Sequence, residues 1–320
     1  MGRPQVLAAN LQAPWGLAFL PDGSALVSER DTRRLLRVAR DGKVRAVQTI
    51  TAADANGEGG LLGIAVSPSY AEDQLVYAYY TTRTDNRIAR FRLGDEPKPI
   101  VTGIPVSGVH NGGRLAFGPD GMLYAGTGDA SERGRSQDVT SLGGKVLRMT
   151  PDGRPAPGNP FPGSLVFTLG HRNVQGLGFD DAGRVYATEF GQNSFDEVNL
   201  LRSGSDYGWP RVEGDVASAG ATPPLLTWRP AEASPSGAVV AAGSLWVAAL
   251  RGQRLWQVPL DGRGGAGEPV PHLRGEFGRL RHVALEPGGA ALWLLTSNRD
   301  GRGSPQPDDD RIVRLPLVGA

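Results

Sequence analysis

The sequence predicts an all-β fold, a six-bladed β-propeller built as a single domain over residues 1–320. The 46 glycines and 25 prolines are spread along the chain without a short period, which is typical of many tight turns. One pattern also occurs six times along the chain. It consists of an apolar strand, a turn rich in Pro, Asp and Gly, a second apolar strand, a polar loop and a third strand. The alternative, a row of small sandwiches, is disfavoured because no Pro- and Ser-rich linker divides the chain.

The repeats follow each other at the spacing of propeller blades, roughly 40–50 residues. The first strands of the six blades are expected to start near Gly16, Gly63, Leu115, Gly176, Gly237 and Val283. The third strands are expected at "RLLRV", "RIARFRL", "KVLRM", "DEVNLL", "RLWQV" and "RIVRL". The N-terminal segment "QVLAANL" is expected to add an outer strand to the last blade, which closes the ring and protects its edge.

Composition excludes several classes of function. With 34 basic and 33 acidic residues the net charge is +1, so nucleic acid and anionic membranes are not expected as partners. No stretch approaches the ~18 apolar residues of a membrane-spanning helix, and the first residues lack the apolar core of a signal peptide. The absence of cysteine excludes disulfides and thiolate chemistry, and only four histidines remain, so we expect no zinc cluster but ample oxygen ligands for a hard cation.

Propeller topology predicts where the functional groups lie. Residues before each first strand and residues between the second and third strands emerge on one face, so we expect the chemistry there, over the axis. His110 and Asp129 flank the first two strands of one blade, and antiparallel pairing would bring them together. Such a pair serves a general base, although it could equally brace the channel as a structural contact.

The stretch "GHRNVQGLGF" places polar groups directly before a buried strand. Arg172, Asn173 and Gln175 supply a fixed cation and two amides, which suit a polar planar ligand or developing negative charge. The alternative is a hydrogen-bond network that connects the inner loops. His171 is expected to be a structural histidine with both ring nitrogens bonded.

Arginines at three other positions predict an anion pocket. Arg279 and Arg281 alternate across one residue, so their side chains point the same way in an extended chain. Together with Arg251 they would bind a ligand with several carboxylates, whereas each alone would be an ordinary surface arginine.

The segment from Glu189 to Pro210 combines a glycine turn with Asp196, Glu197 and Asp206, which is oxygen chemistry typical of calcium or, alternatively, of a capped turn. The charged loop from Arg299 to Asp310 is expected to be a flexible rim rather than a site. Its Asp308–Asp310 run could hold a cation, but solvated charge is the favoured interpretation.

Eight motifs together resemble the soluble quinoprotein glucose/sorbosone dehydrogenase family, of the aldose sugar dehydrogenase type. They are "PWGLAFLPDG", "GEGGLLGIA", "HNGGRLAFGPDG", "TGD", "GGKVLRMTPDG", "GHRNVQG", "DEVNLL" and "DYGWP". The resemblance implies a propeller that carries pyrroloquinoline quinone (PQQ) and calcium and oxidises the anomeric hydroxyl of an aldose to a lactone. An external electron acceptor and a periplasmic or secreted location are expected with it.

The same resemblance assigns roles to individual residues. His110 would be the base that removes the hydroxyl proton, Asp129 its support, and Arg172 a group beside the quinone oxygens. Cofactor contacts are implied for Glu58, Arg172, Asn173, Gln175, Arg251, Arg279 and Arg281. Calcium ligands are implied at the backbone carbonyls of Gly191 and Gln192 and, for another calcium, at Glu197 and the carbonyl of Tyr207.

Three positions depart from the family pattern. Arg251 stands where some relatives have lysine, Val174 replaces a proline, and Glu58 replaces a glutamine and adds a negative charge. Two other functions stay open at this point: a calcium-dependent lactonase-type hydrolase, and a non-catalytic propeller that binds protein or glycan.

Overall fold

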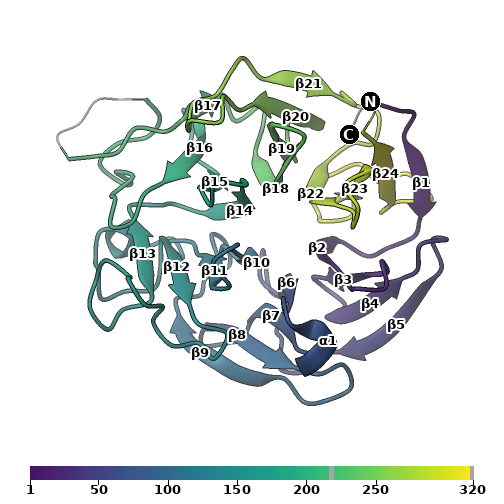
Figure 1. Ribbon diagram of the computed structural model, residues 1–320, viewed down its shortest axis with the longest axis horizontal. Coiled ribbons are helices and arrows are strands. Elements are labelled where there is room, and N and C mark those ends of the chain that lie inside the picture. The colour runs from purple at the N-terminus through teal and green to yellow at the C-terminus, as the bar shows by residue number, and fades with distance from the viewer. Residues whose placement is uncertain (216–219, 318–320) are drawn as a thin grey trace.

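The computed structural model describes residues 1–215 and 220–317, which form a ring of six four-stranded antiparallel sheets (Figure 1). Each sheet is one blade. In five blades the strands follow chain order from the axis outward, and in the sixth the N-terminal strand is the outermost. The first three blades contain β2 (Pro14–Phe19), β3 (Ala25–Glu29), β4 (Arg34–Val38) and β5 (Val44–Thr49); β6 (Leu61–Val66), β7 (Val76–Thr81), β8 (Asn86–Phe91) and β9 (Lys98–Ile104); and β10 (Leu115–Phe117), β11 (Leu123–Gly126), β12 (Lys145–Met149) and β13 (Val166–Leu169).

The other three blades contain β14 (Val174–Phe179), β15 (Val185–Glu189), β16 (Asp196–Leu201) and β17 (Leu226–Trp228); β18 (Pro235–Ala241), β19 (Ser244–Ala249), β20 (Arg254–Pro259) and β21 (Val270–His272); and β22 (Leu280–Leu285), β23 (Ala291–Thr296), β24 (Ile312–Pro316) and β1 (Gln5–Ala8). Two short helices, α1 (Tyr70–Asp73) and the 3₁₀ turn η1 (Arg133–Ser136), lie in connections. No helix in the described ranges is long and apolar enough to span a membrane. The six-bladed propeller predicted from the repeats is therefore confirmed.

The N-terminal strand closes the ring, as the sequence predicts. Strand β1 pairs antiparallel with β24, with Gln5 opposite Arg314 and Val6 opposite Val313. Strands β1 and β24 consequently lie side by side in Figure 1. Backbone hydrogen bonds between the first and last parts of the chain hold the sixth blade together, so the outer edge of β24 is not left open.

Glycines in the inner strands allow the blades to approach each other at the axis. A Cβ atom at Gly63 of β6 would lie 2.1 Å from the carbonyl oxygen of Gly113, and one at Gly176 of β14 would lie 2.2 Å from that of Ser236. Because real Cβ atoms do not approach oxygen so closely, only glycine fits these positions. The glycine that recurs at the start of the repeats thus has a packing reason.

The hydrophobic core lies between neighbouring blades. All six residues of β7 are buried, because each face of this strand packs against an adjacent blade. Trp15 of the first blade, Tyr79 of the second and Leu147 of the third belong to one buried cluster. This packing makes the ring a stable frame on which the loops of one face are positioned.

Candidate active site

A cavity of about 440 Å³ opens among the loops that precede the inner strands and follow the second strands. A second, narrower cavity adjoins it and shares Glu58, Phe190, Leu250, Arg279 and Arg302 with it. The residues that line the two cavities come from all six blades, so the combined space lies at the axis. Of the residues predicted for the site, the cavities are lined by Glu58, His110, Arg172, Gln175, Gly191, Gln192, Arg251, Arg279 and Arg281.

His110 and Asp129 meet as the sequence predicts. The Nδ1 atom of His110 lies 2.8 Å from Oδ1 of Asp129. The other carboxylate oxygen of Asp129 accepts a hydrogen bond of 2.9 Å from the indole nitrogen of Trp209, a partner that the sequence analysis missed. Burial works to raise the pKa of Asp129, but the hydrogen bonds from His110 and Trp209 outweigh it and hold the pKa below its usual value. The carboxylate therefore stays ionised beside the imidazole.

Glu58 holds the backbone of the same histidine. Its Oε2 accepts a hydrogen bond of 3.0 Å from the backbone N–H of His110, which has a left-handed φ of 57°. Its Oε1 lies 2.7 Å from a guanidinium nitrogen of Arg302 in the last loop. The extra negative charge at position 58 is thus balanced by an arginine and joins two loops across the cavity.

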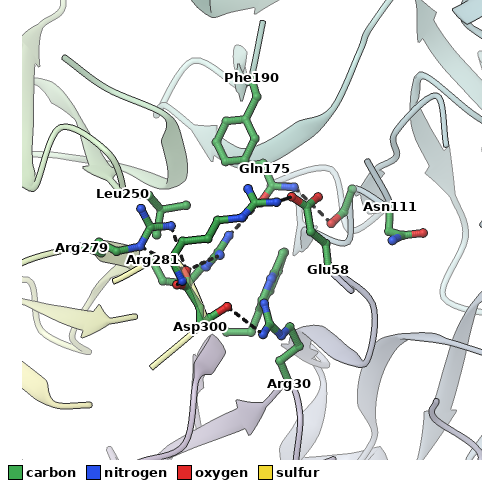
Figure 2. A pocket seen from close by; sticks show the side chains of 12 residues that line it. Arg30, Glu58, Asn111, Gln175, Phe190, Leu250, Arg279, Arg281 and Asp300 are labelled. Atoms are coloured by element: carbon green, nitrogen blue, oxygen red, sulfur yellow. Dashed lines mark hydrogen bonds and ion pairs between the residues drawn. The ribbon is translucent and has the colours of Figure 1, made fainter. Parts of the chain in front are cut away.

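The arginine pocket contains a carboxylate of its own, Asp300 (Figure 2). One oxygen of Asp300 lies 2.9 Å from Nη2 of Arg279 and 3.6 Å from Nη2 of Arg281. Arg30 donates to the backbone carbonyl of Asp300 at 3.3 Å. Burial lowers the pKa of Arg281 to about 10, against the attraction of Asp300. Arg279 and Arg281 therefore point the same way, as expected, but their charge is already partly balanced.

The expectation for the Arg299–Asp310 loop is wrong. Asp300 and Arg302 line the cavity, and the side chains of Asp309 and Asp310 are buried rather than solvated. Asp310 accepts hydrogen bonds from the backbone N–H groups of Ala13 and Asn298. The carboxylates of this loop tie it to the rest of the ring because they satisfy backbone donors that no strand pairs.

Arg172 lines the wider cavity with His110 and contacts the loop that follows β15. Its Nη1 donates to the carbonyl oxygen of Gly191 at 2.6 Å, and its guanidinium lies 5.5 Å from the ring centroid of Trp209. Burial lowers the pKa of Arg172, although Asp129 and other carboxylates oppose the shift. Its Nε is buried and has no hydrogen-bond partner among the described residues.

The two amides of the "GHRNVQ" stretch behave differently from each other. Asn173 is fully buried, does not line either cavity, and accepts hydrogen bonds from the backbone of Gly112 and from Gln175. Gln175 lines the narrower cavity and accepts a hydrogen bond of 3.1 Å from Arg281. Asn173 thus joins the inner loops through its oxygen, and its Nδ2 is buried without a hydrogen-bond partner among the described residues. His171 is buried with both ring nitrogens bonded, to Thr168 and Glu189, as expected.

One carboxylate oxygen of Glu213 organises the loop that contains Gly191 and Gln192. This oxygen accepts hydrogen bonds of 2.7–3.2 Å from the backbone N–H groups of the four residues 192–195. Because a trans peptide directs its C=O opposite to its N–H, the carbonyls of Gly191 and Gln192 point away from Glu213. The contact between the Gly191 oxygen and Arg172 agrees with this direction. Sequence reasoning missed Glu213, which follows the "DYGWP" motif without any signal of its own.

The second set of predicted calcium ligands lies outside the cavity. Glu197 is buried and accepts hydrogen bonds from Asn199 and from the backbone of Gly214. Burial and the neighbouring Glu189 raise its pKa. Tyr207 is buried and stacks on His171 at 4.8 Å. Within residues 1–215 and 220–317 no three His, Asp or Glu side chains gather to hold a metal, so backbone carbonyls would have to contribute ligands.

The charges around the cavities match a polyanion. Six arginines line the combined space, at positions 30, 172, 251, 279, 281 and 302, against three carboxylates, at positions 58, 196 and 300. Among the described lining residues the arginines thus outnumber the carboxylates by three, and one of them, Arg30, also pairs with Asp31 at 2.6 Å. The Nε atoms of Arg172 and Arg281 are buried donors without partners among the described residues, which also suits an oxygen-rich ligand.

Comparison with known proteins identifies the family. The model of the Glucose / Sorbosone dehydrogenase family matches residues 11–312. The chain belongs to this family. The PQQ-bound aldose sugar dehydrogenase of Streptomyces coelicolor is a close structural relative of this glucose/sorbosone dehydrogenase family member, with 52% identity, 98% of each chain covered and a TM-score of 0.94.

Two further relatives extend the comparison. A Thermus thermophilus structure described as an oxidoreductase (glucose dehydrogenase) is 42% identical, covers 98% of this chain and 99% of its own, and has a TM-score of 0.91. Quinoprotein glucose dehydrogenase B of Acinetobacter calcoaceticus is 34% identical over 66% of this chain and 52% of its own length. This family member thus spans about half the length of that curated relative.

Besides Glu213, three residues of the candidate site in this family member were not found from the sequence. Trp209 stands inside the recognised "DYGWP" motif, so the motif marked the position but not the contact with Asp129. Asp300 and Arg302 lie in a loop whose composition is that of an ordinary charged surface. Trp209 and Arg302 could not be found by a register or spacing rule, because their partners Asp129 and Glu58 are on other blades. Asp300 meets Arg279 and Arg281 of its own blade, but it lies in a loop whose conformation no strand period predicts.

Proposed function

We propose that this chain is a PQQ-dependent sugar dehydrogenase that oxidises the anomeric hydroxyl of aldoses to a lactone, with calcium as a second cofactor. The observation that carries the proposal is the His110–Asp129 pair beside a cavity in which arginines outnumber carboxylates. The PQQ-bound relative of 52% identity supports the choice of cofactor.

The proposed cofactor site uses the arginines of the narrower cavity. Arg279, Arg281 and Arg30 would bind carboxylates, and Arg172 would lie near the oxygens where negative charge grows. Bound there, PQQ would supply the hydride acceptor. Arg251 is exposed at the wider cavity and adds a cation at its rim.

The proposed cation site uses backbone oxygens. The carbonyls of Gly191 and Gln192 supply the oxygen donors that Ca²⁺ prefers. Because Glu213 binds the N–H groups of the same peptides, these carbonyl oxygens point away from the Glu213 carboxylate. Because Arg172 donates to the Gly191 oxygen, a cation there would use the second lone pair of this oxygen or displace the guanidinium. The second proposed site, at Glu197 and Tyr207, would relieve the repulsion between Glu197 and Glu189.

His110 acts on the proton in this proposal. Its Nδ1 is engaged by Asp129, so Nε2 is the nitrogen left to accept the proton of the anomeric hydroxyl. Asp129 keeps the required tautomer and stabilises the imidazolium that forms, and Trp209 holds Asp129 in place. With PQQ bound as the hydride acceptor, His110 would hold the proton on Nε2 until solvent removes it through the open cavity.

The alternative functions receive less support. A calcium-dependent lactonase needs carboxylates and amides around one axial metal, whereas arginines dominate the cavities here. A non-catalytic propeller would have no need of an ionised carboxylate behind a histidine that lines the cavity.

The test combines cofactor titration and turnover. The purified chain with Ca²⁺ and PQQ should bleach a redox dye when aldoses are added, and His110→Asn should lose turnover while binding PQQ with unchanged affinity. Asparagine is chosen because it tolerates the left-handed backbone at position 110. His272→Ala, on the outer strand β21, is the matched control. Full turnover of His110→Asn would overturn the base assignment, and failure to bind PQQ at any Ca²⁺ concentration would point to the non-catalytic alternative.

The partners and location remain part of this proposal. The substrate is an aldose, the electrons pass to an external acceptor, and the family resemblance favours a periplasmic or secreted protein.

A further inference from the structure

The axial channel is blocked halfway by a group of side chains, the plug, formed by Trp15, Arg114, Gln175, Arg281 and His282. Arg281 bonds to Gln175, and Nε of Arg114 donates to the Gln175 backbone carbonyl at 2.8 Å. Both guanidiniums lie on the ring of Trp15, at 4.2 Å for Arg114 and 5.6 Å for Arg281. Trp15, Gln175 and Arg281 face the cofactor-side cavity, whereas Arg114 and His282 face the other way.

Beyond the plug lies a second cavity of about 380 Å³, here called the funnel. Its walls come from the six inner strands β2, β6, β10, β14, β18 and β22, which surround the axis in Figure 1. Apolar side chains line it, among them Phe19, Val66, Phe117, Phe179, Val239 and Leu285. The inner strands run from the loop face that bears the proposed active site, so the funnel opens on the opposite face.

Arg114 brings an unbalanced charge to the inner end of this apolar space. The residue is 3% exposed, and its Nη2 is buried without a hydrogen-bond partner among the described residues. None of the described carboxylates forms an ion pair with it, and the neighbouring charge that acts on it is the like charge of Arg281. Burial first, and then the charge of Arg114, push the pKa of His282 well below its usual value, so this histidine is neutral.

A buried guanidinium without a counterion is costly, and arginine does not release its proton readily. An anion in the upper cavity cannot supply the missing contact, because Arg114 does not line that cavity. The counterion must therefore reach it from the funnel, and the walls there favour an apolar body over a fully hydrated ion.

We propose that the funnel is a second ligand site, which binds a small carboxylic acid anion with its carboxylate at Arg114 and its short alkyl chain against the apolar wall. The carboxylate would approach the guanidinium of Arg114 from the funnel and balance the charge that none of the described carboxylates pairs, while Nε stays bonded to the Gln175 carbonyl. The alkyl chain would contribute by burial, about three- to fourfold in affinity for each methylene that enters the funnel. This site is independent of the proposed dehydrogenase activity.

The test is calorimetric titration of the full chain, without PQQ, with sodium butyrate, sodium hexanoate and hexylammonium chloride at constant ionic strength in a buffer free of carboxylates. We expect saturable binding of both acids, with hexanoate about tenfold or more tighter than butyrate, and no binding of the amine. Equal affinity for the two acids, or no saturable binding, would overturn the proposal.

Two variants locate the site. Arg114→Met keeps the apolar stem over Trp15 and should abolish hexanoate binding. Ala116→Leu places a larger side chain in the funnel but keeps Arg114, so it tests the site even if the arginine variant does not fold. The matched control is Ala71→Leu, an exposed position of α1. Hexanoate binding that survives Ala116→Leu would contradict the proposal.

A competition experiment separates the funnel from the cofactor site. Saturating PQQ and Ca²⁺ should leave the hexanoate affinity within about twofold, because the plug divides the two cavities. Displacement of hexanoate by PQQ would place the acid on Arg279 and Arg281 and would refute the funnel site. A chain that binds hexanoate but not PQQ would leave the funnel standing and would contradict the dehydrogenase proposal alone.

Discussion

Replacing Asp129 with asparagine tests the proposed base most sharply. The two carboxylate oxygens of Asp129 accept hydrogen bonds from His110 at 2.8 Å, Trp209 at 2.9 Å and the backbone N–H of Ser131 at 2.9 Å. An asparagine of the same shape has one acceptor oxygen, so its NH₂ group must face either the imidazole or the indole. The variant thus removes the charge and one acceptor while it fills the same volume.

The size of the effect follows from these contacts. A hydrogen bond to a charged group contributes about 1.5–3 kcal/mol, which corresponds to a loss of roughly 10- to 150-fold if only that bond is lost. If the NH₂ group faces His110, the imidazole takes the wrong tautomer, and the contribution of the general base, about 10²–10⁴-fold, is lost as well. We therefore expect kcat/KM of Asp129→Asn to fall by about 10²–10⁴-fold.

The assay measures turnover and cofactor binding side by side. Dye reduction with saturating PQQ and Ca²⁺ gives kcat/KM for the aldose, and absorbance titration gives the PQQ dissociation constant. Because Asp129 lines neither cavity, that constant should stay within about threefold of the wild-type value. Asp152→Asn, an exposed aspartate paired with Arg90, is the matched control. A variant that retains wild-type kcat/KM, or loses PQQ affinity in proportion to activity, would refute the reasoning.

Two further predictions concern residues of the candidate site, and a third concerns a buried lysine of β12. Trp209→Phe keeps the ring near Arg172 but removes the N–H that holds Asp129, so kcat should fall by about tenfold with PQQ affinity unchanged; an unaltered kcat would show that the bond does not matter. Glu213→Gln replaces the acceptor of four backbone N–H groups. The Ca²⁺ affinity of the PQQ-free chain, measured by calorimetry, should fall by about tenfold or more. An affinity equal to that of the wild type would show that Glu213 does not support the cation site. Burial lowers the pKa of Lys145 from 10.5 to about 8. Between pH 8 and pH 10.5 the unfolded chain therefore binds this proton more readily than the folded chain, so the free energy of unfolding should rise with pH in this range. Urea unfolding of Lys145→Met should lack this rise, and an identical pH dependence in both proteins would contradict it.

Local patterns were sufficient for the fold. The blades could be predicted because apolar strands and Pro/Asp/Gly turns repeat within each unit, and this pattern depends only on neighbours in the chain. The His110–Asp129 contact could also be predicted, since both residues flank the hairpin of β10 and β11 and lie 19 positions apart. The direction of Arg279 and Arg281 followed from the two-residue period of a strand.

Residues that act across blades could not be predicted. Trp209 reaches Asp129 over 80 positions, and Arg30 contacts Asp300 over 270. The Arg299–Asp310 loop was expected to be a solvated rim, because its composition does not reveal that the ring folds it back over the axis. The same limit applies to Arg114, whose unpaired charge appears only when six inner strands enclose it.

The sequence by itself therefore determined the number of blades, the loop face on which the two arginine-lined cavities open, and the family. Only the tertiary structure decided how the charges balance: which carboxylate neutralises which arginine, which loop Glu213 orients, and which guanidinium is left alone in the channel. The physical reason is that strand periodicity and turns are set by adjacent residues, whereas charge balance depends on distances between residues that only the closed ring brings together.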